Sequence, residues 1–130
     1  MDLSPELYLH GYVDRLDVAP TGEVRIVDYK TGKSPKPGWE DKAFFQLRVY
    51  ALLYWRNHGV IPKLLQLIYM GDTRLLKSTP TEKDLIKTEQ ILFDVAADIL
   101  RAIERNEFTP RPTKLCDWCF FKAICPAHVG

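Results

Sequence analysis

The sequence predicts a mixed α/β domain in which helices flank a mixed β-sheet, with the element order β-β-α-β-α. Two short segments rich in apolar residues lie on either side of a turn, and a long segment with helical spacing follows them. A further apolar strand then precedes a second long helical segment. The chain has 130 residues, of which 46% are hydrophobic, and this fits one globular domain.

The first two elements are expected to form a β-hairpin. Residues 9–19 alternate between apolar and polar side chains, and residues 24–32 form an apolar segment that ends in DYKTG. Between them, the sequence PTGE at 20–23 is typical of a turn, because Gly22 tolerates a positive φ. Residues 33–41 then form a loop that contains two prolines.

Two helices and a strand with a short return strand are expected to complete the domain. Apolar residues recur at helical spacing from Phe44 to Tyr54, and Gly59 provides a C-terminal stop. An apolar strand covers 63–72, and residues 73–80 contain the return strand. A cap at Thr79 or Thr81 then opens the longest helix. We assign 1–110 to the core and 111–130 to a cysteine-containing tail of the same domain.

Composition limits the classes of function. The chain carries 18 basic and 17 acidic residues, so binding to nucleic acid would depend on a local site and not on a generally basic surface. No apolar run approaches the roughly 18 residues that span a bilayer, and the N-terminal residues lack the pattern of a secretory signal. We therefore expect a soluble, cytoplasmic protein without a membrane partner.

Charged side chains stand on the two hairpin strands in a pattern that suggests a metal site. Asp28 and Lys30 are two residues apart, so they share one face of a strand, and Asp14 lies on the partner strand. Two adjacent carboxylates favour a divalent cation such as Mg²⁺ or Mn²⁺, and a neighbouring amine can stabilise charge on a phosphate. This set suits phosphodiester hydrolysis. The alternative is a row of solvated ion pairs on an exposed face.

The motifs GYVDRLD, VDYKTGK and QLRVY resemble, in order and spacing, the RecB-like branch of the PD-(D/E)xK nuclease superfamily. The resemblance implies a restriction-endonuclease-like core and a metal-dependent deoxyribonuclease of the exonuclease type. It implies that Asp14, Asp28 and the Tyr29 carbonyl hold Mg²⁺ or Mn²⁺, and that Lys30 assists the attacking water. The same resemblance implies that Gln46 and Tyr50 orient Lys30 or the DNA strand.

The three cysteines, all near the C-terminus, form the pattern C-x2-C-x5-C at Cys116, Cys119 and Cys125. In a chain without an export signal this clustering favours metal ligation or a reactive thiol over a disulfide framework. The trio resembles that of RecB-like nucleases with a 4Fe-4S cluster, namely the AddB-type helicase-nuclease subunits and the CRISPR-associated exonucleases. Their fourth cysteine lies upstream of the nuclease motifs. A zinc site completed by His128 is the alternative.

The sequence departs from this family at its N-terminal end. The family places a helix before the first strand, and that first core helix is missing here. We therefore expect either the C-terminal part of a longer nuclease or a minimal member of the family. Two other classes stay open. One is a non-catalytic DNA-binding or scaffold remnant of a nuclease domain, and the other is a zinc-stapled interaction module.

DNA is the partner that the resemblance implies, together with a helicase or other subunits of repair or CRISPR complexes. Repair, recombination, CRISPR adaptation and phage DNA processing all use this branch. Candidate contacts to phosphates are Arg15, Lys33 and Lys36, because they surround the predicted metal site. Trp39 in the same loop is a candidate for stacking on an unpaired base, or a packing anchor.

Overall fold

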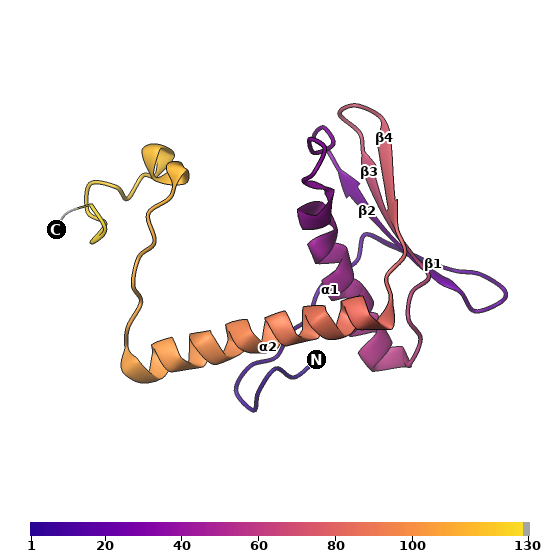
Figure 1. Cartoon of the computed structure of the whole chain (residues 1–130), viewed down its shortest axis with the longest axis horizontal. Helices are drawn as coiled ribbons and strands as arrows, with labels where there is room; N and C mark the ends of the chain where they lie inside the picture. The colour runs from indigo at the N-terminus through magenta and orange to yellow at the C-terminus, as the bar shows by residue number, and fades with distance from the viewer. Residues whose placement is uncertain (129–130) are drawn as a thin grey trace. The chain divides into compact units, whose positions relative to one another are not determined.

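The computed structural model, which describes residues 1–128, contains a mixed sheet of four strands. Its spatial order, β1-β2-β3-β4, follows the order of the chain (Figure 1). The pairs β1–β2 and β3–β4 are antiparallel, whereas β2 and β3 are parallel. The strands are β1 (Arg15–Val18), β2 (Val24–Lys30), β3 (Leu64–Tyr69) and β4 (Arg74–Ser78). The predicted mixed α/β class with the order β-β-α-β-α is confirmed.

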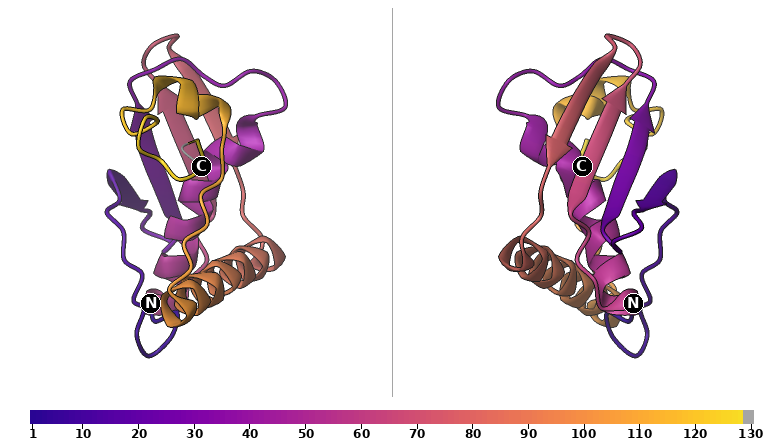
Figure 2. Two further views of the ribbon diagram at one scale, coloured as in Figure 1. Left: turned by 90° about the vertical axis from the view of Figure 1, so that its left-hand side faces the viewer. Right: turned by 90° about the vertical axis from the view of Figure 1, so that its right-hand side faces the viewer.

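Helix α1 (Glu40–His58) connects the two parallel strands and covers one face of the sheet (Figure 2). Its buried residues Phe44, Leu47 and Ala51 recur at helical spacing and pack on Ile26 of β2 and Leu67 of β3. At its end Gly59 adopts the left-handed conformation, with φ of 74°, and its N–H bonds to the Trp55 carbonyl at 2.7 Å. This confirms the predicted stop.

Strand β1 is shorter than the sequence suggested, because residues 9–14 lie outside it. The Leu9 N–H donates to the Met1 carbonyl at 2.8 Å, so this part of the chain pairs locally near the N-terminus. At the other end of β1 the predicted turn is present. The Gly22 N–H donates to the Ala19 carbonyl at 2.8 Å, and Gly22 has φ of 90°.

Helix α2 (Glu82–Arg105) begins with a reciprocal cap. The Asp84 N–H donates to Thr81 Oγ1 at 3.1 Å, and the Thr81 N–H donates back to Asp84 Oδ2 at 3.0 Å. Thr81, and not Thr79, is therefore the capping residue. Within residues 1–128, no helix is both long and apolar enough to cross a membrane.

The chain divides into two compact units, and the division falls within α2. The first unit is Met1–Ala96 and contains the whole sheet and α1. The second unit begins at Ala97 and contains the end of α2 and a short 3-10 helix, η1 (Lys114–Trp118). All residues of the candidate hairpin site belong to the first unit.

Candidate active site

The hairpin brings Asp14 to Asp28. Arg15 pairs with Val27 in the antiparallel register, so the preceding residue, Asp14, lies opposite Asp28. The Tyr29 N–H donates to Asp14 Oδ2 at 3.0 Å. A longer first strand would use that N–H in the ladder, so this contact ends β1 at Arg15. The bond lowers the pKa of Asp14, and neighbouring Asp28 and Lys30 lower it further.

Asp28 is the buried member of the pair. Its side chain points to the face covered by α1, and the residue is only 5% exposed. Burial raises the pKa of this carboxyl, and the nearby Asp14 adds to the rise, while Lys30 opposes it. A row of solvated ion pairs, the alternative considered for this strand, does not fit a carboxylate buried in this way.

Lys30 contacts Asp28 as an ion pair without the geometry of a hydrogen bond. Its Nζ lies 2.7 Å from Asp28 Oδ2, yet that buried oxygen has no hydrogen-bond partner among the described residues. The two observations agree if the ammonium approaches from an angle that hydrogen bonding does not allow. Contact with Asp28 raises the pKa of Lys30. The ammonium therefore partly compensates the charge of the buried carboxylate.

A short relay of side chains holds Lys30 from α1. Its Nζ donates to Gln46 Oε1 at 2.9 Å, and Gln46 Nε2 donates to the Tyr50 hydroxyl at 2.8 Å. The two bonds fix the orientation of the Gln46 amide, since its oxygen must face the ammonium. Gly11 lies against the Tyr50 ring, because a Cβ at Gly11 would be 2.8 Å from Tyr50 Cε1. The structure thus brings together Asp14, Asp28, Lys30, Gln46 and Tyr50.

The oxygen donors at the hairpin fit a hard divalent cation. Asp14 and Asp28 supply carboxylate oxygens, and one Asp28 oxygen is buried without a hydrogen-bond donor. Such oxygen donors are those that Mg²⁺ and Mn²⁺ prefer. In residues 1–128 no group of three or more His, Cys, Asp or Glu side chains could hold a metal ion. Among the described residues, Asp14 and Asp28 are therefore the carboxylates available at this site, and the Tyr29 carbonyl follows Asp28 directly in the chain.

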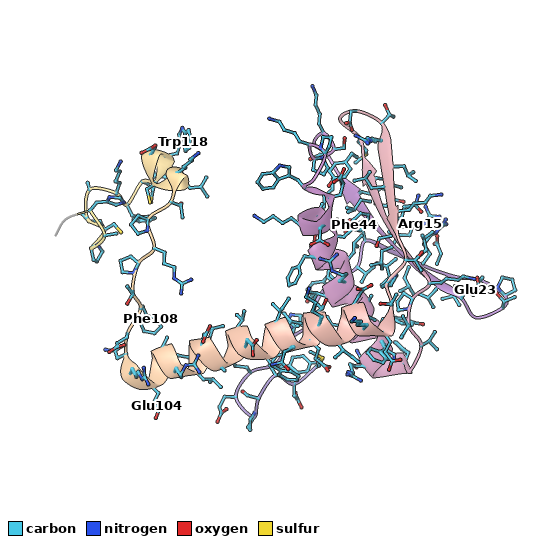
Figure 3. All side chains as sticks on the ribbon, in the orientation of Figure 1. Arg15, Glu23, Phe44, Glu104, Phe108 and Trp118 are labelled. Atoms are coloured by element: carbon cyan, nitrogen blue, oxygen red, sulfur yellow. The ribbon has the colours of Figure 1, made fainter. Side chains whose placement is uncertain are left out.

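The candidate DNA contacts lie in two different parts of the fold. Arg15 lies on the face away from α1, and its guanidinium is bonded to Asp17 and the Tyr29 hydroxyl. Figure 3 shows Arg15 on the opposite side of the sheet from Phe44 of α1. By contrast, Lys33 and Lys36 are exposed in the loop after β2.

Trp39 stands at the N-terminal end of α1 and is 56% exposed. The Lys42 ammonium lies 5.3 Å from the centre of its ring. The ring therefore has a cation close to it and much of its surface open to solvent.

The three cysteines lie in the second unit as free thiols. Cys116 and Cys125 are half-buried and Cys119 is exposed. Cys116 Sγ accepts a hydrogen bond of 3.3 Å from the Thr113 N–H, which caps η1. A 4Fe-4S cluster needs four thiolates, and the three here are not gathered as a metal site within residues 1–128. Trp118, Phe120 and Phe121 around them are exposed.

A second feature, at the turn between β3 and β4, was not predicted from the sequence. The Asp72 carboxylate accepts hydrogen bonds from the Ser34 N–H and hydroxyl, 38 residues earlier in the chain. The Ser34 bonds lower the pKa of Asp72. Gly71 and Asp72 belong to the predicted strand 63–72, and the only sequence signal for this contact is that glycine and aspartate are common in turns.

The structure thus combines a four-stranded mixed sheet with a buried Asp28 and a Lys30 on β2, next to Asp14 just before β1. The chain matches the PD-(D/E)XK nuclease superfamily over residues 1–126 and belongs to it. Among individual proteins, it is similar to the Gene 69 protein of Mycobacterium phage L5, with 30% identity over 121 residues, and to the Gene 69 protein of Mycobacterium phage D29, with 30% identity over 123 residues.

These alignments cover 91% and 92% of this chain but only 39% and 43% of the two phage proteins. The chain thus spans about two fifths of the length of the curated relatives that it matches. The superfamily implies a DNA substrate, a phosphodiester-cleaving activity and a divalent metal.

Proposed function

We propose that the chain is a RecB-like, metal-dependent deoxyribonuclease of the exonuclease type, with its active site at the β1–β2 hairpin. The observation that carries the proposal is the buried Asp28 carboxylate with Asp14 and Lys30 beside it. Placing an ionisable carboxylate in such surroundings is costly unless a charge partner or metal compensates. Superfamily membership supports the same conclusion.

Each residue has a specific task in this proposal. Asp14, Asp28 and the Tyr29 carbonyl would hold Mg²⁺ or Mn²⁺, which supplies an acidic water and charge neutralisation at the phosphate when bound. Lys30 positions the attacking water and stabilises negative charge on the phosphate.

The α1 residues act on Lys30. Gln46 accepts a hydrogen bond from its ammonium, and Tyr50 holds the Gln46 amide. The two side chains therefore keep the ammonium aimed at one position as charge develops on the phosphate.

The test is cleavage of end-labelled single-stranded and duplex DNA with Mn²⁺, Mg²⁺ or EDTA. Labels on the 5′ or 3′ end and a circular substrate distinguish shortening from the ends from internal cutting. We expect metal-dependent loss of nucleotides from linear DNA and an intact circle. Absence of cleavage, with no Mn²⁺ binding that depends on Asp14, would favour the alternative of a non-catalytic DNA-binding or scaffold remnant.

We further propose that Cys116, Cys119 and Cys125 take part in a 4Fe-4S site whose fourth ligand comes from outside this trio. The support is the C-x2-C-x5-C spacing of the three cysteines. The competing site is zinc held by the trio and His128. Anaerobic purification with metal analysis separates them, because an iron-sulfur cluster absorbs visible light and zinc does not.

We also propose a biological context for this activity. The relatives are phage proteins, which supports phage DNA processing among the pathways considered, with repair, recombination and CRISPR functions as the others. A helicase or other subunit of such a complex is the proposed protein partner. Co-purification of the full chain from its host during infection tests this, and recovery of the chain alone would count against a stable complex.

A further inference from the structure

The parallel ladder between β2 and β3 continues beyond the last residues of both strands. The Met70 N–H donates to the Lys30 carbonyl at 2.9 Å, and the Gly71 N–H donates to the Gly32 carbonyl at 2.9 Å. The second contact requires glycine at position 71, because a Cβ there would lie 2.6 Å from the Gly32 carbonyl oxygen. The turn after β3 is therefore in direct backbone contact with the loop after β2.

Asp72 extends this contact by one more residue with its side chain. The Ser34 N–H donates to Asp72 Oδ1 at 3.2 Å and to Oδ2 at 3.1 Å, and the Ser34 hydroxyl donates to Oδ2 at 2.5 Å. A carboxylate that accepts from both a backbone amide and a hydroxyl of one residue fixes that residue in position and orientation. The segment Gly32–Ser34 is thus held at two consecutive points from the opposite turn.

Two lysines without an ion-pair partner among the described residues lie in this segment or just after it. Lys33 immediately precedes Ser34, and Lys36 follows it by two residues, with Pro35 between them limiting the backbone. Both lysines are exposed, and neither forms an ion pair with a residue of the described part of the chain. The Lys36 carbonyl accepts from the Trp39 N–H at 3.0 Å, which ties the far end of the segment to the start of α1.

We propose that Asp72 is a positioning residue for DNA binding, which holds the loop 32–36 so that Lys33 and Lys36 contact the phosphate backbone beside Lys30. This inference rests on the proposed function for its ligand, a DNA strand. It assigns Asp72 no contact with the substrate. The expected effect of removing Asp72 is the opposite of the usual one for an acidic residue. Removal of a negative charge ordinarily strengthens binding to DNA, whereas here it should weaken binding.

The experiment measures the binding of a fluorescent single-stranded oligonucleotide in EDTA over a series of salt concentrations. Each lost lysine–phosphate contact should lower the slope of log affinity against log salt by about 0.7. We expect Lys33→Ala and Lys36→Ala each to weaken binding and lower the slope in this way. Asp72→Ala should do the same although it removes a negative charge, and Lys33→Ala should then add little in the Asp72→Ala background.

Asp94→Ala is the matched control, because it removes an exposed carboxylate that is bonded only to Gln90 on α2. It should bind DNA as tightly as wild type or more tightly, with an unchanged slope. Ser34→Ala, which removes only the hydroxyl contact, should fall between wild type and Asp72→Ala. Thermal melting checks that every variant is folded.

A second measurement tests, in the absence of DNA, whether Asp72 restrains the loop 32–36. Trypsin cleaves after lysine, and the Lys33–Ser34 bond is the one whose amide Asp72 holds. We expect Asp72→Ala, but not Asp94→Ala, to speed cleavage at this bond.

The proposal is overturned if Asp72→Ala behaves like Asp94→Ala in binding and in proteolysis, or if neither lysine variant changes the salt slope. Failure of the proposed nuclease function would appear separately. If wild type did not cleave DNA with Mn²⁺, the proposed nuclease function would fail. The binding measurements are made in EDTA and do not depend on that cleavage.

Discussion

The Lys30 ammonium lies 2.7 Å from the Asp28 carboxylate, on the face of the sheet that α1 covers. Asp28 is buried whereas Lys30 is half-buried, so the acidic group lies inside the fold and the basic group is closer to solvent. Asp14 approaches from the residue just before β1, and Gln46 holds Lys30 from the helix. Strand β2, the residue before β1 and helix α1 therefore all contribute side chains around this pair.

Divalent metal should stabilise the folded chain through the two aspartates. A ligand that binds only the native state adds about 2.7 kcal/mol at a concentration 100 times its dissociation constant. We expect Mn²⁺ to raise the unfolding temperature of wild type, and Asp14→Asn and Asp28→Asn to abolish the rise. Asp17→Asn is the control, because Asp17 is bonded to Arg15 and Arg25 away from the site. An equal response in all four proteins would contradict the assigned ligands.

Gly11→Ala should reduce cleavage through Tyr50. The added Cβ would lie 2.8 Å from Tyr50 Cε1, so the ring must shift and its bond to Gln46 must lengthen. Displacement of a positioning group by about 1 Å can cost up to roughly 100-fold in rate, and we expect at least tenfold. In a Tyr50→Ala background the same substitution should cause no further loss. If the double variant lost activity by the product of the two single losses, Gly11 would act independently of Tyr50.

The sequence could predict which residues come together at the hairpin, but not the surroundings that the fold gives them. Spacing along the strands placed Asp28 and Lys30 on one face and Asp14 nearby, because strand periodicity depends only on the local chain. The burial of Asp28 could not be predicted, since it depends on which face of the sheet α1 covers. The Asp72–Ser34 contact joins two loops that are distant in the sequence, and no local pattern encodes such a pairing.

Gly71→Ala should destabilise the fold far more than Gly32→Ala. A Cβ at position 71 would meet the backbone of Gly32 and Lys33 at 2.6–2.9 Å, and neither backbone can move without disturbing the strands. Overpacking of this kind costs about 1–3 kcal/mol in the free energy of unfolding. A Cβ at Gly32 would meet no atom within 4 Å, so that variant is the matched control. Urea denaturation measures both, and equal losses would contradict the close approach of the two loops.

Asp72 should make part of the stability depend on acid pH. Its pKa in the folded state is lowered from the ordinary 3.8 by the bonds from Ser34, so its stabilising effect is complete above that value. The effect should disappear as the pH falls through the lowered folded pKa. We therefore expect the difference in unfolding temperature between wild type and Asp72→Asn to be constant from about pH 7 to 5 and to shrink below about pH 4.

The control for this acid dependence is the same comparison in a Ser34→Ala background. There the hydroxyl bond is gone, so less of the difference should depend on pH. A difference between wild type and Asp72→Asn that does not change with pH would show that the charge of Asp72 plays no part.

Cleavage by the Asp28 and Lys30 variants tests the central claim most directly. Wild type, Asp28→Ala and Lys30→Ala are incubated with end-labelled DNA and Mn²⁺, after melting curves in EDTA have shown that all three are folded. The account predicts cleavage by wild type and a loss of at least about 100-fold in both variants, as expected for groups that act on the developing charge of the phosphate. Equal cleavage by all three proteins would contradict the assignment of the active site.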